Sequence, residues 1–352
     1  MKDKKTKKKG FLGITSRVLM LITAGVLVLS YVSMLVNPAK AWGFTLLGLM
    51  FIPLAILNFI LLLWAIKRKS GSLVIPLLAL LPSFFFIGRY IQIGDGEKDA
   101  SGEPTLKILS YNVGRFASCE ADSLFTFLRG QDPDIICLQE FHVSDIDKVR
   151  KYLRRQMKGY KSEFYLFPMA DGSAFGNVTL SRIPVKDKGK IKFEESANLA
   201  IYTDYEYEGR TFRVYNCHFE SYSISLPGLV RGLFNADRTV MAATGSKMKR
   251  SITRRPQQVN MVFDDIEKCP VEAFVCGDFN DDPMSYTYFR MSRGRKDSFR
   301  EAGGGFGATY ARIWPLLRID YIMLPERFNA ISHKTLRVDY SDHYPIMSTV
   351  EL

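Results

Sequence analysis

Val-Cys-Gly-Asp-Phe-Asn occupies residues 275–280, and two further acidic fragments follow it, Arg-Ile-Asp-Tyr-Ile at 318–322 and Ser-Asp-His at 341–343. Each fragment places a carboxylate beside an apolar run that is typical of a β-strand. Converging carboxylates repel one another unless a cation lies among them, and hard divalent ions prefer oxygen ligands. His343 adds a group that titrates near neutral pH in its ordinary state. The three fragments therefore indicate metal-assisted chemistry at phosphorus.

Three upstream segments have the same character. Residues 106–113 alternate apolar and polar side chains and reach Asn112 at their end. Residues 134–140 form a buried-strand run that ends on Glu140, and residues 212–219 alternate again and carry His218. We expect each segment to be a strand that presents its polar residue near one end.

In this order, the segments at 106–113, 134–140, 275–280, 318–322 and 341–343 resemble the endonuclease/exonuclease/phosphatase superfamily, in its deoxyribonuclease/sphingomyelinase-like branch. The superfamily includes pancreatic deoxyribonuclease, abasic-site endonucleases, neutral sphingomyelinases and inositol polyphosphate 5-phosphatases. The resemblance covers about residues 104–352. It implies a four-layered α/β/β/α sandwich and hydrolysis of phosphoric ester bonds.

The resemblance also implies a metal site. Glu140 is expected to be the main ligand, with Asn112 and Asp342 completing or supporting the site. The expected ion is Mg²⁺, with Mn²⁺ as the alternative. A sparse set of protein ligands suits Mg²⁺, which keeps several waters and binds through one or two carboxylates.

The remaining roles follow from the same resemblance. Asp278 is expected to orient or deprotonate the attacking water, and Asn280 to bind phosphoryl oxygens or hold its neighbours in place. His343 is expected to contact the phosphate, while Asp320 accepts a hydrogen bond from the other ring nitrogen. His218 occupies the position of a second catalytic histidine, which favours the deoxyribonuclease and sphingomyelinase branches over the abasic-site endonucleases.

The net charge of +12 is unevenly distributed. Residues 1–100 contain 13 of the 48 basic and 4 of the 36 acidic residues, which leaves 35 basic and 32 acidic residues in the remainder. The predicted catalytic part is therefore nearly balanced, and the charge is weak support for a nucleic-acid partner. The five cysteines form no Cys-x-x-Cys or Cys/His cluster, so a zinc site is not expected.

Residues 1–100 are predicted to be a membrane anchor, and residues 101–352 the catalytic domain. Three apolar stretches, at about 15–36, 42–66 and 73–93, are long enough to cross a bilayer and carry at most one charge each. A cleaved signal peptide would be followed by polar sequence, whereas two further apolar stretches follow here. We therefore expect three retained transmembrane helices.

Basic residues predict the orientation of this anchor. Six lysines precede the first stretch, and three basic residues lie in the 67–72 loop. By the positive-inside rule both segments are cytoplasmic, which places the catalytic domain on the extracytoplasmic side, in the manner of a periplasmic domain held by a bacterial inner membrane. If residues 73–93 were only an interfacial hairpin, the domain would instead face the cytoplasm.

Residues 221–258 combine many basic residues with apolar ones and contain almost no acid. Two interpretations stay open: an insert that contacts phosphate or anionic lipid headgroups, or an amphipathic surface helix with a solvated basic face. Among substrates we favour nucleic acid and keep a phospholipid, as in sphingomyelinases, as the alternative. A second alternative is a non-catalytic membrane receptor or scaffold that retains the fold.

Three further residues are expected to have no direct part in the chemistry. Arg182, in Ser-Arg-Ile-Pro at 181–184, is expected to brace the site. His142 and His333 lie outside any motif and are expected to be surface histidines.

Overall fold

The computed structural model describes residues 2–94, 98, 101–222 and 238–352, and these form two compact units. The first unit comprises Met1–Gly88 and Met284–Tyr286, and the second comprises Arg89–Pro283 and Thr287–Leu352.

The first unit is helical. One stretch, Ile14–Leu35, has the length and composition to cross a membrane, with 22 residues and a mean hydropathy of 2.3. The helices are α1 (Lys2–Val32), η1 (Ser33–Leu35), α2 (Gly43–Leu49), α3 (Phe51–Lys67), η2 (Gly71–Leu73), α4 (Val74–Leu80) and α5 (Ser83–Ile87). The prediction of three spans is not supported by these helices.

The second predicted span is broken. Helices α2 and α3 meet at Met50 with a bend of 58°, so they are either one broken span or a re-entrant segment. Pro53 lies in the first turn of α3, where the missing N–H would have no partner in the helix. Proline is therefore compatible with a new helix at Phe51 but not with continuation of α2 through that position.

The third predicted span is too short. Pro82 cannot donate a backbone hydrogen bond to the preceding turn, and α4 ends at Leu80. The apolar helical stretch Gly71–Ile87 falls short of the roughly 20 residues that a crossing requires. Ile91–Gln92, at the end of the predicted span, form strand β1, which pairs with β11 (Gly305–Phe306) in the second unit.

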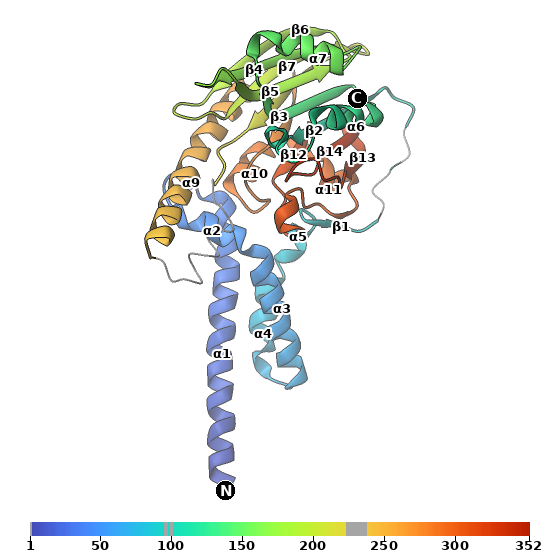
Figure 1. Ribbon diagram of the computed structural model, residues 1–352. Coiled ribbons are helices and arrows are strands. Elements are labelled where there is room, and N and C mark those ends of the chain that lie inside the picture. Colours follow the sequence, from blue (N-terminus) through green and yellow to red (C-terminus); the bar gives the residue numbers. More distant parts are fainter. Residues whose placement is uncertain (1, 95–97, 99–100, 223–237) are drawn as a thin grey trace. The chain divides into compact units, whose positions relative to one another are not determined.

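The second unit contains two six-stranded sheets (Figure 1). The first has the strand order β13-β14-β2-β3-β5-β4 and the second the order β10-β12-β9-β8-β7-β6. The strands are β2 (Thr105–Asn112), β3 (Ile135–Val143), β4 (Lys161–Pro168), β5 (Ala174–Ser181), β6 (Val185–Lys192), β7 (Leu199–Tyr207), β8 (Arg210–His218), β9 (Glu272–Asp278), β10 (Arg295–Asp297), β12 (Asp320–Pro325), β13 (Asn329–Thr335) and β14 (Ile346–Glu351).

Strand β3, in the first sheet, is buried on both of its faces. Its residues Ile135, Ile136, Cys137 and Leu138 are all fully buried. Because successive side chains point to opposite faces, Ile135 and Cys137 join the core between the sheets, while Ile136 and Leu138 join the core under the helices. Burial on both faces explains the uninterrupted apolar run in the sequence.

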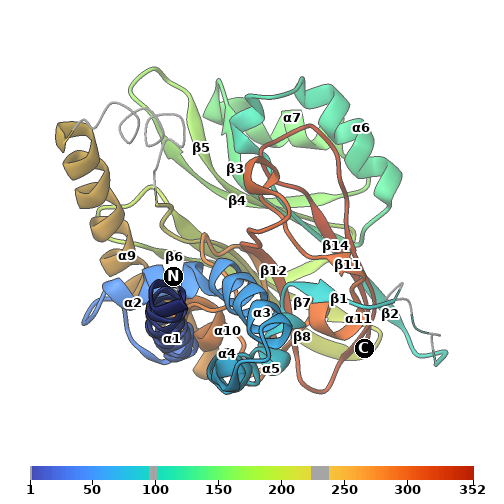
Figure 2. The same ribbon diagram turned by 90° about the horizontal axis from the view of Figure 1, so that it is seen from below.

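Helices cover the outer faces of the two sheets. On the first sheet α6 (Ala121–Gln131) and α7 (Val149–Gln156) lie together (Figure 2), and Leu124 and Leu153 belong to the same buried cluster. On the second sheet, Tyr215 of β8 donates a hydrogen bond to Asp265 of the long helix α9 (Arg238–Glu267). The unit is thus a mixed α/β sandwich with two sheets, as the family resemblance implies.

His333 differs from its prediction as a surface histidine. Its side chain is only 4% exposed, and its Nδ1 lies 2.8 Å from the Ser298 hydroxyl. Burial, together with the nearby Arg318 guanidinium, lowers the pKa of His333 to about 3. The position is on β13, where the bulge between Ala330 and Ser332 sets which side chains face the core.

We expect this histidine to make the fold acid-sensitive. A base whose pKa is lowered by folding binds more protons when unfolded, so stability is full above pH 6.5 and falls toward pH 3. The free energy of unfolding, measured by urea titration, should drop by about 3 kcal/mol more between pH 7 and pH 4 in the wild type than in His333→Asn. Ser298→Ala is the control, because it removes the hydrogen bond but keeps the ring. Equal pH dependence in wild type and His333→Asn would contradict the assignment.

Candidate active site

The register of the second sheet places the predicted acidic and histidine residues beside one another. Strands β8 and β9 are parallel and pair His218 with Asp278 at their carboxyl ends. Strand β12 runs antiparallel to β9 and begins with Asp320, directly opposite Asp278. Three chemistry-bearing residues thus occupy one row across three adjacent strands.

Asp278 is the hub of the site. Its Oδ2 accepts hydrogen bonds from Asn112 Nδ2 at 2.9 Å and from Asn280 Nδ2 at 3.1 Å. Its Oδ1 accepts from the backbone N–H of Asn280 at 2.8 Å. The carboxylate is 1% exposed, so these donors replace water and fix its orientation.

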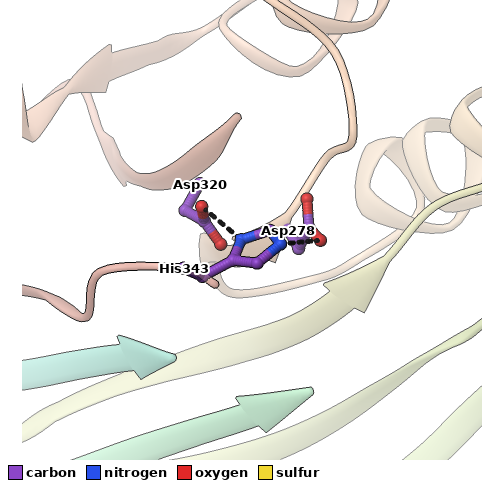
Figure 3. Close-up of side chains that lie close together, drawn as sticks. All are labelled: Asp278, Asp320 and His343. Atoms are coloured by element: carbon purple, nitrogen blue, oxygen red, sulfur yellow. Dashed lines mark hydrogen bonds and ion pairs between the residues drawn. The ribbon is translucent and has the colours of Figure 1, made fainter. Parts of the chain in front are cut away.

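Two histidines bracket this carboxylate. His218 Nε2 and His343 Nε2 each lie 3.8 Å from Asp278 Oδ2. His343 Nδ1 is 3.0 Å from Asp320 Oδ2 (Figure 3), which fixes the imidazole ring between two carboxylates. His218 Nε2 also lies 3.7 Å from Glu140 Oε1, which links the residues of the second sheet to β3 of the first.

The electrostatics of the hub follow from burial. Burial raises the pKa of Asp278 to about 6, although the neighbouring histidines and Asn112 favour the ionised form. Burial opposes the charge on His343, but the Asp320 and Asp278 carboxylates prevail and raise the pKa of His343 to about 10. The imidazole of His343 is therefore a cation at neutral pH in this arrangement.

Backbone conformation is unusual at two of these residues. Glu140 has φ of 51° and Asn280 has φ of 52°, both in the left-handed region that non-glycine residues seldom adopt. At Glu140 the pairing of β3 with β5 shifts register between Leu138 and Phe141. Such strain is typical of functional sites, and here it re-aims the Glu140 side chain out of the regular strand alternation.

A cavity of about 380 Å³ is lined by part of this cluster of acidic, amide and histidine side chains. Glu140, Asp342, Asp278, Asn280 and His343 all line it. The other lining residues are Gly114, Ala117, Ser118, Ser221, Tyr222, Tyr310, Arg312, Ile313, Leu317 and Ile319. The cavity brings together residues that lie more than 200 positions apart in the sequence.

Two arginines lie at this site that no sequence pattern indicated. Arg115 Nε lies 3.5 Å from Glu140, and Arg312 Nε lies 3.5 Å from Asp342. Both arginines are at least half exposed, so they are free to exchange the carboxylate for another anion. No motif marks either residue. Only their positions shortly after Asn112 and before Asp320 could have suggested them.

The donors present fit a hard divalent ion. Ligand atoms of Asp278, Asp320 and His343 all lie within 4.8 Å of one another, and Asp320 Oδ1 is buried without a hydrogen-bond partner among the described residues. The Glu140 carboxylate is 27% exposed at the cavity. The predicted ligand set of Asn112, Glu140 and Asp342 therefore remains a prediction. In the group of Asp278, Asp320 and His343, the protonated imidazole of His343 itself supplies positive charge between the two carboxylates.

Arg182 does not brace this site. It pairs with Asp132 and lies over the ring of Tyr160, 4.9 Å from the centroid, and it does not line the cavity. The reason is its position just after β5, next to the turn that precedes β3, where its backbone N–H donates to Asp134.

The basic residues at 221–258 do not share one environment. Residues 223–237 lie outside the described residues. Arg255 is 1% exposed, pairs with Asp281 at 3.0 Å and stacks over Tyr222 at 4.2 Å. Arg254 pairs with Glu195, and Arg250 lies 4.0 Å from the same carboxylate. Arg255 is therefore a structural residue and not a headgroup contact, because its guanidinium is enclosed.

Two parts of the chain match profiles of known protein families. Residues 109–343 match the profile described as the Endonuclease/Exonuclease/phosphatase family. Residues 11–90 match a second profile, described as a domain of unknown function. No curated protein matches the chain.

Several solved structures share the fold. An endonuclease/exonuclease/phosphatase from Beutenbergia cavernae is 18% identical with a TM-score of 0.51, covering 70% of this chain and 72% of that one. The catalytic domain of human Nocturnin with a bound sulfate is 17% identical with a TM-score of 0.51, covering 70% and 93%. The D. rerio TDP2 structure with a single-strand DNA product is 18% identical with a TM-score of 0.50, covering 71% and 100%. At these identities the likeness establishes the fold alone.

Proposed function

Because the chain belongs to the endonuclease/exonuclease/phosphatase family, we propose that it is a membrane-attached, Mg²⁺-dependent phosphodiesterase of the nuclease type. The observation that carries the proposal is the buried Asp278 carboxylate held between His218 and His343 at the wall of an open cavity. A structural role alone would not require two histidines and two asparagines around one carboxylate.

The residues divide the work of hydrolysis at phosphorus. Asp278 accepts the proton of the attacking water, and its hydrogen bonds from Asn112 and Asn280 hold it in place for this transfer. His343 carries positive charge beside the cavity and stabilises the non-bridging oxygens as negative charge develops on them. Asp320 holds the direction of that ring by accepting a hydrogen bond from its Nδ1.

Glu140, Asn112 and Asp342 would hold the ion. When bound, Mg²⁺ would supply positive charge near the phosphoryl group and help to orient the ester. We expect His218, whose Nε2 lies near both Glu140 and Asp278, to hydrogen-bond the phosphate or the leaving oxygen. Nucleic acid is our preferred substrate, since a protein of the same fold has been solved with a single-strand DNA product.

The test uses the full chain in detergent. We expect Mg²⁺-dependent, chelator-sensitive hydrolysis of bis(p-nitrophenyl) phosphate and nicking of plasmid DNA. Release of headgroups from phospholipid vesicles with DNA left intact would instead establish the lipid phosphodiesterase alternative. Absence of all three activities with both Mg²⁺ and Mn²⁺ would support the non-catalytic alternative.

Membrane attachment is a separate part of the proposal. Ile14–Leu35 supplies one crossing, and the lysines before it favour a cytoplasmic amino terminus. One crossing puts the catalytic unit outside the cytoplasm, whereas a second crossing by the bent pair α2–α3 would return it.

We expect alkaline phosphatase fused after Leu352 to be active in a bacterial host, and a fluorescent protein at the same place to be dark. The control is the same pair of fusions to a chain that starts at residue 89 and lacks the helical unit. A bright fluorescent fusion with an inactive phosphatase fusion would mean an even number of crossings and overturn the proposed orientation.

A further inference from the structure

A second, larger cavity lies in the catalytic unit, across one segment from the catalytic cavity. It has a volume of about 900 Å³. Residues Gly114, Ala117 and Ser118 line the catalytic cavity, while Phe116 and Ala121, from the same segment, line the larger one. Glu140 and His142, two residues apart on β3, likewise line the catalytic and the larger cavity respectively. The two cavities therefore share both of these walls.

The rim of the larger cavity is basic. Five cationic side chains from α7 and its flanks line it, and the one acidic lining residue, Asp145, is already paired with Lys148 at 2.6 Å. The five are Lys148, Lys151, Arg154, Arg155 and Lys158. Lys151, Arg154 and Lys158 are exposed and make no ion pair or side-chain hydrogen bond with any residue that the structure describes. Three like charges on a concave surface without counter-charges form a site for an anion.

The floor of this cavity is apolar and partly aromatic. Phe116 and Tyr152 are half-buried, and both pack against Phe125 in the core under α6 and α7. Val143 and Val149 complete the apolar part. An aromatic floor below a row of cations is the arrangement by which proteins bind single-stranded nucleic acid, with bases on the rings and phosphates on the cations.

Resting on the function proposed above, we propose that the larger cavity is a binding subsite for the single-stranded nucleic acid that flanks the scissile phosphodiester. The strand continues from the catalytic cavity across the 114–121 segment to the cations of α7. A flat bilayer is disfavoured as the occupant because the cations line a hollow, which a flexible polyanion can enter and a membrane surface cannot.

The test reverses the three unpaired cations together, as Lys151→Glu, Arg154→Glu and Lys158→Glu, in the full chain in detergent. A matched control reverses three exposed cations that line neither cavity, Lys268, Arg293 and Arg300, with the same change in charge. Binding of a fluorescein-labelled 20-mer DNA is measured by anisotropy in chelator. Hydrolysis of bis(p-nitrophenyl) phosphate, a small ester that needs only the catalytic cavity, is measured with Mg²⁺.

We expect the cavity variant to bind the 20-mer at least tenfold more weakly than the control at 100 mM salt. The slope of log K against log salt concentration should also become shallower by about two, because fewer counterions are released on binding. Its hydrolysis of the small ester should equal that of the wild type. Equal 20-mer binding by cavity variant and control would overturn the subsite. The subsite would also be overturned if the wild type bound phosphatidylglycerol vesicles but not DNA, and the cavity variant lost this vesicle binding. Failure of the wild type to hydrolyse the small ester would count against the proposed function alone, since binding in chelator is read independently.

Discussion

Asp278→Asn will lower kcat for phosphodiester hydrolysis by about 10³-fold, the range by which a general base accelerates proton transfer. Asparagine keeps the shape and one acceptor, which can still receive the Asn280 backbone N–H. It places an NH₂ group or a non-basic oxygen where Oδ2 now accepts from Asn112 and faces two imidazoles. The change removes the carboxylate on which both imidazoles converge and keeps the side-chain shape at the end of β9.

The measurement is kcat and KM for bis(p-nitrophenyl) phosphate with saturating Mg²⁺, together with the urea midpoint of each variant. Asp187→Asn, an exposed position on β6 that lines neither cavity, is the control and should retain wild-type kinetics. If Asp278→Asn keeps more than a tenth of the wild-type kcat with an unchanged urea midpoint, Asp278 is not the base. A parallel loss of kcat in Asp320→Asn, smaller than that of Asp278→Asn, is expected because Asp320 acts through the His343 ring.

The parts of this site that could be predicted are those encoded by strand endings. Asn112, His218 and Asp278 each end a strand whose alternation or apolar run is visible in the sequence. Parallel pairing of β8 with β9 then brings His218 and Asp278 into register. The fold class came from the resemblance of these segments to the family, whereas their apolar patterns indicate only that each is a strand.

The parts that could not be predicted depend on what covers a residue. Arg255 and His333 belong to polar local sequences, yet the structure encloses both. Burial of Arg255 requires Asp281 and Tyr222, which approach only after folding. Hydropathy also overstated the number of membrane spans, because it averages over Pro53 and Pro82 and does not register the helix ends that these residues favour.

Arg318→Met will lower the free energy of unfolding by about 3–5 kcal/mol, because it leaves the Asp297 carboxylate buried without its partner. Arg318 and Asp297 are each 1% exposed at the side chain and are joined by two hydrogen bonds of 2.7 and 2.6 Å. The guanidinium also lies over Phe299 and Tyr321, with its central carbon 4.5 and 4.7 Å from the ring centroids. Methionine replaces the packing of the stem but neither the charge nor the fork of donors.

The second substitution Asp297→Asn separates charge from packing. Asparagine can still accept from the Phe299 N–H that Asp297 caps at the start of α11 (Ser298–Ala302), but it carries no charge. Burial raises the pKa of Asp297 and Arg318 opposes this strongly enough to lower it overall, so loss of the arginine reverses the direction. Arg318→Met should therefore be less destabilised at pH 5 than at pH 8, whereas Arg318→Met/Asp297→Asn should recover stability at pH 8 and lose this pH dependence. Equal urea midpoints for the single and double variants at pH 8 would mean that packing, and not the unpaired carboxylate, determines the cost. Since Arg318 lies two residues before Asp320, activity measured at 20 °C in the same variants would then report whether this ion pair also holds the start of β12 in place.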